Sequence, residues 1–404
     1  MKKLSSSIKQ YLIITANYWA FTLTDGALRM LVVLHFYQLG YTPLSIALLF
    51  LFYEIFGVVT NLIGGWLGAI LGLNRTMNIG LAIQIIALAM LLVPAEMLTV
   101  VWVMVAQAFS GIAKDLNKMS AKSAIKLLLP EEGSNSKLYH WVAVLTGSKN
   151  TMKGFGFFLG AALLNSIGFK NAAAAMAIAL FVVLLFSLFY LKKDLGKIKS
   201  KPKFSQLFSK NRAINYLSAA RMFLFGSRDI WFVVALPVYF TSQLAWEHWQ
   251  VGAFMASWVI GYGLIQSVAP KITGPSPSGN SAIFWVFLLS LLTALIAWFF
   301  SSFPKHSEMI LIIGLVFFGI IFAINSSLHS YLIVSYSDSE SISMDVGFYY
   351  MANAMGRLVG TVLSGWIYQS HGLTACLSAA AVFLFLSFIL SFGLPSSRYT
   401  YRSV

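Results

Sequence analysis

Long apolar stretches follow one another along almost the whole chain, separated by short polar connections. Most are close to 20 residues or longer, about the length at which a helix crosses the hydrocarbon core of a bilayer. The pattern predicts twelve membrane-spanning helices, at residues 11–38, 43–72, 76–93, 98–120, 138–164, 171–191, 214–241, 247–270, 281–302, 308–335, 343–369 and 373–394. The sequence therefore predicts an all-α integral membrane protein.

Composition agrees with this prediction. Of the 404 residues, 58% are hydrophobic and only 10% are charged, whereas soluble proteins have about 25% charged residues. The single cysteine, Cys376, lies in the last predicted span, where we expect it to pack as a small apolar residue. The first apolar run is too long for the core of a signal peptide, so we expect it to remain as a span.

A basic segment separates the first six predicted spans from the last six. Residues 191–213 hold eight lysines and arginines against one aspartate, which is typical of a cytoplasmic linker, with contact to anionic lipids as the alternative. Basic residues gather at the cytoplasmic face of membrane proteins, and this rule explains the net charge of +15, so binding to nucleic acid is not needed to explain it. The same rule predicts that both termini are cytoplasmic. The predicted domains are an N-tail over 1–10, a six-helix bundle over 11–191, the linker over 192–213, a second bundle over 214–394 and a C-tail over 395–404.

The two halves repeat several features. The matching positions are Asn17, Tyr18 and Arg29 with Asn215, Tyr216 and Arg228, and Gly156 and Gly160 with Gly356 and Gly360. Small residues four apart let membrane helices approach closely. Two paired six-helix halves joined by a basic linker resemble the major facilitator fold, in which two pseudo-symmetric bundles hold a substrate at the membrane midplane.

Several charged residues lie inside the predicted spans. Placing one charged side chain at the centre of a membrane helix costs about 2.5–3.5 kcal/mol of insertion free energy. The bases are Arg29, Lys114, Lys149, Lys153, Arg221, Arg228 and Arg357, and the acids are Asp25, Glu54, Asp115 and Asp229. Seven bases against four acids leave a surplus of three positive charges, which is unfavourable unless an anion or water compensates it. We therefore predict a multiply charged anionic substrate that contacts these bases, with Asn17 and Tyr18 beside them.

Arg29 and Arg228 hold equivalent places in the two halves. The planar guanidinium group suits a phosphate-like ligand, which the pair would clamp. The alternative is a structural ion pair, of Arg29 with Asp25 or of Arg228 with a neighbouring helix. Lys149 and Lys153 are four apart and share one helix face, so we expect one of them to contact the substrate.

The acids have two possible roles. Asp25 and Glu54, and with them Asp115 and Asp229, either couple transport to protons or simply compensate the bases. Among the aromatic residues, Tyr18, Trp19 and Tyr53 are deep enough to line a cavity. His329 could titrate, but a lone histidine more often makes an ordinary packing contact.

Several long segments resemble one family. These are NYWAFTLTDGALRMLVVLHFYQLGY at 17–41, IFGVVTNLIGGWLGAILGLNRTMNIGL at 55–81, SGIAKDLNKMSAKSAIK at 110–126 and, more loosely, GRLVGTVLSGWIYQ at 356–369. They resemble the organoarsenical efflux permeases of bacterial arsenic operons, the ArsJ-type major facilitators. The resemblance implies export of 1-arseno-3-phosphoglycerate, which a partner glyceraldehyde-3-phosphate dehydrogenase makes from arsenate, and hence arsenate resistance. It also implies the bacterial inner membrane.

Three alternatives stay open. An organophosphate or phosphate exchanger of the same fold would need the same bases. The excess of basic residues disfavours a proton-driven drug exporter, because a site for cations needs acidic residues. The paired arginines disfavour a membrane scaffold or sensor that transports nothing. The sequence has no Walker loop, HExxH, CxxC or nucleophile elbow. We therefore expect no enzyme activity, cofactor or metal, and a monomer.

Overall fold

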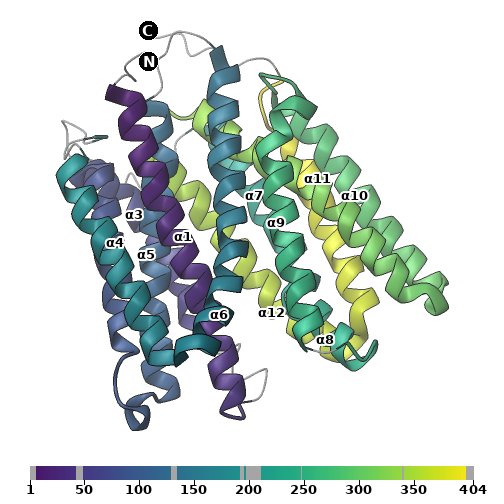
Figure 1. Cartoon of the computed structure of the whole chain (residues 1–404). Coiled ribbons are helices and arrows are strands. Elements are labelled where there is room, and N and C mark those ends of the chain that lie inside the picture. Colours follow the sequence, from purple (N-terminus) through teal and green to yellow (C-terminus); the bar gives the residue numbers. More distant parts are fainter. Residues whose placement is uncertain are drawn as a thin grey trace. The chain divides into compact units, whose positions relative to one another are not determined.

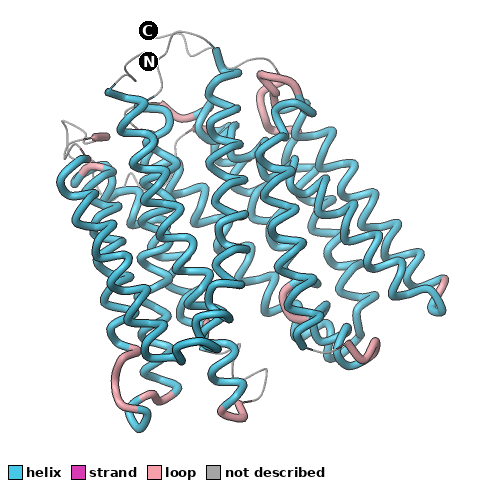
Figure 2. The backbone as a smooth tube through the Cα atoms, in the orientation of Figure 1, coloured by secondary structure: helices cyan, strands magenta, loops and turns pink. Residues whose placement is uncertain are grey.

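The computed structural model describes residues 6–41, 49–128, 134–191, 195–196, 211–246, 248–338 and 341–396. Within these ranges the regular elements are all helical and no strand is present (Figure 2). The prediction of an all-α protein is confirmed. Residues 1–5 and 397–404 of the two predicted tails, most of the predicted linker and residues 43–48 of the second predicted span lie outside the described residues.

The long apolar stretches of the sequence form the main helices (Figure 1). Their bounds are α1 Ser6–Gln38, α3 Leu51–Leu71, α4 Leu73–Met90, α5 Val100–Leu128, α6 Ser134–Tyr190, α7 Arg212–Phe232, α8 Ala235–Ser242, α9 His248–Thr273, α10 Gly279–Ser302, α11 Ser307–Tyr336 and α12 Ile342–Ser391. In the described part of the chain, the short 3-10 helices Ala95–Met97 and Pro304–His306 precede α5 and α11.

Eight helices in the described part of the chain are long and apolar enough to cross a membrane. Helices α1 and α5 are not among them. These two carry Asp25, Arg29 and the lysines of the 110–126 segment, so charge lowers their mean hydropathy. The chain is thus a multi-pass membrane protein, while the number of twelve spans remains a prediction.

The two longest helices are each interrupted at a glycine. Gly168 in α6 has φ 78° and ψ 173°, and Gly372 in α12 has φ 73° and ψ −174°. Only glycine adopts such positive φ values without strain. The interruptions fall between the predicted spans 138–164 and 171–191 and between 343–369 and 373–394, where the sequence predicts a connection.

The chain divides into two compact units. Unit 1 comprises residues 1–132, 148–208 and 337–351, and unit 2 comprises residues 133–147, 209–336 and 352–404. The units differ from the predicted bundles in the segments 133–147 and 337–351, and the predicted domain boundaries remain a prediction.

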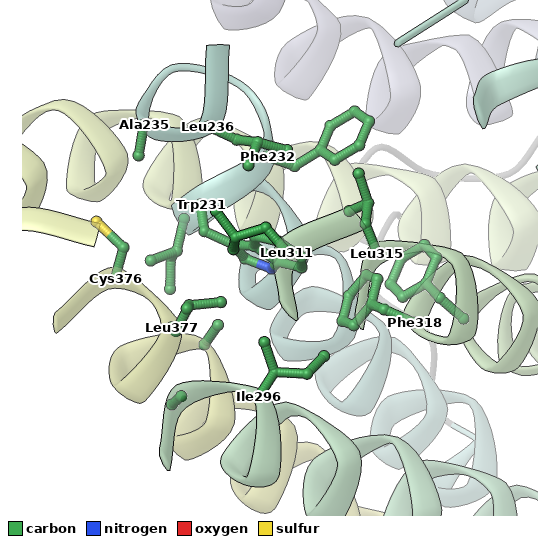
Figure 3. Close-up of a cluster of buried hydrophobic side chains, with 14 of the residues drawn as sticks. Trp231, Phe232, Ala235, Leu236, Ile296, Leu311, Leu315, Phe318, Cys376 and Leu377 are labelled. Carbon is green, nitrogen blue, oxygen red and sulfur yellow. The ribbon is translucent and has the colours of Figure 1, made fainter. Parts of the chain in front are cut away.

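Each unit has its own apolar core. In unit 1 the core includes Phe21, Leu31, Tyr53 and Leu81. In unit 2 the indole of Trp231 packs edge-on against Phe318, with ring centroids 5.1 Å apart, beside Leu311 and Leu315 (Figure 3). Cys376 is a free thiol buried in this core, which confirms its predicted packing role.

The repeated glycines bring helices into backbone contact within each unit. In unit 1, a Cβ at Gly156 of α6 would lie 3.1 Å from the Cα of Gly26 in α1, and a Cβ at Gly26 would lie 2.7 Å from the carbonyl oxygen of Lys153 in α6. In unit 2, a Cβ at Gly360 of α12 would lie 2.5 Å from the carbonyl oxygen of Gly226 in α7. The two halves thus use the same device to join their first and fifth predicted spans, as the small-residue spacing predicts.

A methyl group at the α1–α6 contact is expected to destabilise the protein. We expect Gly26→Ala to lower the free energy of unfolding by about 1–3 kcal/mol, because the backbone of α6 must move away. The thermal midpoint in detergent measures this. Gly365→Ala is the matched control, since a Cβ there meets nothing within 4 Å and alanine favours a helix. Equal midpoints for the two variants would contradict the close contact.

Candidate functional site

Unit 2 contains a cluster of two arginines around one buried carboxylate. Asp229 of α7 is fully buried. Its Oδ1 accepts a hydrogen bond from Nε of Arg228 at 2.6 Å and lies 2.5 Å from Nη2 of the same ion-paired guanidinium group. Its Oδ2 accepts from Nε of Arg357 in α12 at 3.1 Å. The close approach of α7 and α12 at Gly226 and Gly360 makes this possible. One aspartate therefore fixes arginines from two helices.

The arginine cluster keeps a positive charge and access to solvent. Two guanidinium groups and one carboxylate sum to +1, and the side chains of Arg228 and Arg357 are 16% and 24% exposed. Arg228 also lies over the rings of Phe225 and Phe322, at 5.1 and 5.5 Å from their centroids. Asp229 and the aromatic rings hold the guanidinium groups in place, and arginine forks held in this way suit an oxyanion.

Arg221 lies one to two turns before this cluster on α7 and is 3% exposed. Its Nε donates to Oδ1 of Asn353 at 2.9 Å, its Nη1 donates to the Ser326 carbonyl oxygen at 3.3 Å, and it stacks on Phe225 at 3.8 Å. These contacts tie α7 to α11 and α12. In this structure Arg221 supports the cluster from inside unit 2.

In unit 1, the charged residues gather around the ring of Tyr53 on α3. The Tyr53 hydroxyl donates to Oδ1 of Asp25 on α1 at 2.7 Å. The guanidinium carbon of Arg29 lies 4.7 Å from the ring centroid, and Nζ of Lys114 on α5 lies 3.8 Å from it. The phenol of Tyr53 thus donates a hydrogen bond to a carboxylate through its hydroxyl group. The face of its ring attracts two cations, the guanidinium group of Arg29 and the ammonium group of Lys114.

Asp115 forms the second part of this group and is 1% exposed. Its carboxylate lies 2.6 Å from Nζ of Lys118 and 3.8 Å from Nζ of Lys114. Gly57 of α3 leaves room for it, because a Cβ there would lie 2.8 Å from Oδ2 of Asp115. Asp115 therefore compensates two lysines of its own helix.

Arg29 forms an ion pair with Glu54 of α3, with 3.5 Å between Nη2 and Oε1. Its partner is therefore on another helix and is not Asp25. With Lys114 and Lys118 against Asp25 and Asp115, three bases meet three acids in this part of unit 1. The other predicted bases lie outside this group. They are Arg228 and Arg357 of the arginine cluster, Arg221, Lys149 and Lys153.

Four other predicted site residues also lie in unit 1. Lys149 and Lys153 are half-buried on α6; Nζ of Lys149 donates to Asn150 at 3.1 Å, and Nζ of Lys153 lies 5.9 Å from the Phe157 ring centroid. Asn17 and Tyr18 are buried at 2% exposure each, and Asn17 donates to Ser187 at 2.9 Å. In this structure Asn17 holds α1 to the second half of α6.

Phe225, Phe322 and Asn353 were not among the predicted site residues. Phe225 follows Arg221 by four residues and precedes Arg228 by three, so helical spacing alone could have placed it beside both. Phe322 and Asn353 come from other helices, and no local pattern indicates them. His329 is fully buried, and neither ring nitrogen is hydrogen-bonded within the part of the chain that the structure describes.

Among the described residues, no group of three or more histidine, cysteine or acidic side chains is arranged to hold a metal ion. Both clusters consist of charged side chains inside a helical unit, held by ion pairs and aromatic rings. Such groups mark substrate or ion pathways in membrane proteins.

Several solved structures share the fold of this chain. The human organic anion transporter MFSD10 (TETRAN) superposes with a TM-score of 0.77 at 16% identity, over 96% of this chain and 100% of that one. A bacterial homologue of the iron transporter ferroportin gives 0.77 at 12% identity, over 96% and 99%. The E. coli fucose:proton symporter FucP gives 0.74 at 12% identity, over 96% and 99%.

Sequence comparison gives the family. No curated protein matches the chain significantly. The model of the Major Facilitator Superfamily matches residues 11–344, which is most of the sequence. The chain therefore belongs to the Major Facilitator Superfamily and is a multi-pass membrane transporter and not an enzyme.

Proposed function

We propose that the protein exports an organoarsenical anion, 1-arseno-3-phosphoglycerate, by alternating access, and so confers arsenate resistance. The observation that carries the proposal is the cluster of Arg228 and Arg357 on the single buried carboxylate of Asp229. It is positively charged, partly exposed and held on two helices of a transporter. A tetrahedral oxyanion can accept bidentate hydrogen bonds from such arginines.

Charge distribution supports an anionic substrate. The arginine cluster sums to +1, and Arg221 beside it raises the sum to +2. A positive sum of this kind favours a bound anion. The organic anion transporter among the structural neighbours fits the same class of substrate. The arsenical itself is suggested by the resemblance of residues 17–41, 55–81 and 110–126 to the organoarsenical efflux permeases.

The proposal includes the remaining features of this family. Twelve spans in two six-helix bundles, with the basic segment 192–213 between them, would place both termini in the cytoplasm of a bacterium. The interruptions of α6 at Gly168 and of α12 at Gly372 support counting each as two spans. The protein would act as a monomeric antiporter of the inner membrane, next to an arsenate-accepting glyceraldehyde-3-phosphate dehydrogenase.

An organophosphate or phosphate exchanger is the second candidate. Arginine binds arsenate and phosphate oxygens through the same hydrogen bonds, so the arginine cluster suits both substrates. Counterflow separates them. Vesicles that contain the protein and are loaded with phosphate would take up a glycolytic phosphoester in exchange for phosphate only if the protein is a phosphate exchanger.

The arsenical function is tested in arsenic-sensitive cells that express the protein with or without an arsenate-accepting glyceraldehyde-3-phosphate dehydrogenase. We expect cellular arsenic to fall only when both proteins are present, because the enzyme supplies the exported ester. A fall with the transporter alone would indicate export of arsenate itself. If the well-expressed transporter does not lower cellular arsenic either with or without the dehydrogenase, the arsenical function is wrong. Phosphoester exchange then becomes the leading hypothesis.

A further inference from the structure

An apolar groove runs between α9 and α11 in unit 2. It has a volume of about 400 Å³, and its lining includes Phe254, Trp258, Gly261, Ile265, Val316 and Gly319. Apart from Ser257 and the polar atoms of the aromatic residues, the lining side chains are hydrocarbon. A groove of this kind offers a polar anion few hydrogen-bonding partners and no cationic side chain, so it does not serve the substrate proposed above.

Two glycines and one tryptophan shape the groove. A Cβ at Gly261 would meet no atom within 4 Å, so this position leaves the groove open. At Gly319 a Cβ would lie 2.7 Å from Nε1 of Trp258, so the glycine lets the indole lie flat against α11. That Nε1 donates to the carbonyl oxygen of Leu315 at 2.9 Å, and the ring stacks on Tyr262. The wall of the groove is therefore fixed in place.

The groove opens on the apolar outer surface of these helices. Leu264 and Val316, which line it, are 56% and 48% exposed, and Val268 and Phe317 beside it are also exposed. Large apolar side chains exposed on a membrane-spanning helix face the lipid. The groove is thus continuous with the surface that the bilayer covers.

From this geometry we propose that the α9–α11 groove binds one acyl chain of a membrane phospholipid. The lining from Phe254 to Ile265 extends along α9 for about 16 Å at 1.5 Å per residue. This is about half of the roughly 30 Å hydrocarbon core, so the length of the groove is comparable to that of a single acyl chain. An acyl chain lying in it would cover Trp258 and fill the space above Gly261.

The site differs from ordinary lipid contact because it is recessed and its wall is held by a hydrogen bond and aromatic stacking. It also lies behind the arginine cluster: Trp258 stacks on Tyr262, Tyr262 packs on Phe322, and Phe322 lies under Arg228. The inference concerns binding alone, and it stands whether or not the arsenical function is right.

The test uses purified, delipidated full-length protein in detergent with one equivalent of a phosphatidylethanolamine that carries a diazirine at the end of one acyl chain. After photolysis, labelled peptides are mapped by mass spectrometry. We expect saturable labelling of residues 254–265 and 316–320. Gly261→Leu should reduce it roughly tenfold, the loss expected when about two buried methylenes leave the groove.

Gly365→Leu is the matched control, because position 365 of α12 is equally open and lies outside the groove. Both variants are first checked for an unchanged elution volume and thermal midpoint. Equal labelling of both variants, or labelling spread evenly over exposed residues of α10 such as Phe284 and Trp298, would overturn the proposal. So would a Gly261→Leu variant that changes the oligomeric state but not the labelling, since the groove would then be a contact between copies.

Discussion

Replacing Asp229 by asparagine is expected to destabilise the protein by about 3–5 kcal/mol, the usual cost of removing one partner of a buried ion pair. Asp229 is fully buried and bound to both Arg228 and Arg357. Its loss leaves two guanidinium groups close together without a counter-charge. The thermal midpoint of purified protein in detergent, and its yield in the membrane, measure the effect.

A second substitution separates charge from packing in this prediction. The double variant Asp229→Asn with Arg357→Gln restores the net charge of +1 at the cluster. We therefore expect it to be more stable than Asp229→Asn alone, so that the two substitutions show a coupling energy. Additive losses in the double variant would mean that Asp229 does not act through the arginines.

Arg228→Gln and Arg357→Gln are each expected to abolish most transport while leaving the protein folded. Each variant keeps one arginine on Asp229, so the buried carboxylate retains a cationic partner. The lost hydrogen bonds to a charged ligand are worth about 1.5–3 kcal/mol, which corresponds to roughly 10–150-fold in affinity. The measurement is the arsenic content of cells that also express the dehydrogenase, together with the KM for efflux in inverted vesicles.

Arg212→Gln is the matched control for these variants. Arg212 begins the same helix, is exposed, and lies over the ring of Tyr216 away from the cluster. It should transport as the unmodified protein does. Arg228→Lys should recover little activity, because a lysine ammonium cannot form the bidentate fork. Full activity of Arg228→Gln in stably folded protein would exclude the arginine cluster as the anion site.

The long apolar runs and the low fraction of charged residues determined, without any structure, that this chain is an all-α protein of the membrane. This was possible because a bilayer requires every backbone polar group to bond within the segment, which leaves helices as the natural outcome for such runs. The paired glycine spacing likewise indicated where helices would meet, and Gly156 and Gly360 do lie in backbone contact with a neighbouring helix.

Only the tertiary structure decided which charges compensate each other. In sequence, Asp25 stands one turn from Arg29 and is its obvious partner, yet Arg29 pairs with Glu54 and Asp25 bonds to Tyr53. Asp229 likewise holds Arg357, which is 128 residues away. The number of intramembrane charges can be counted from a sequence, but their pairing depends on which helices pack together, and that is set by contacts between residues far apart in the chain.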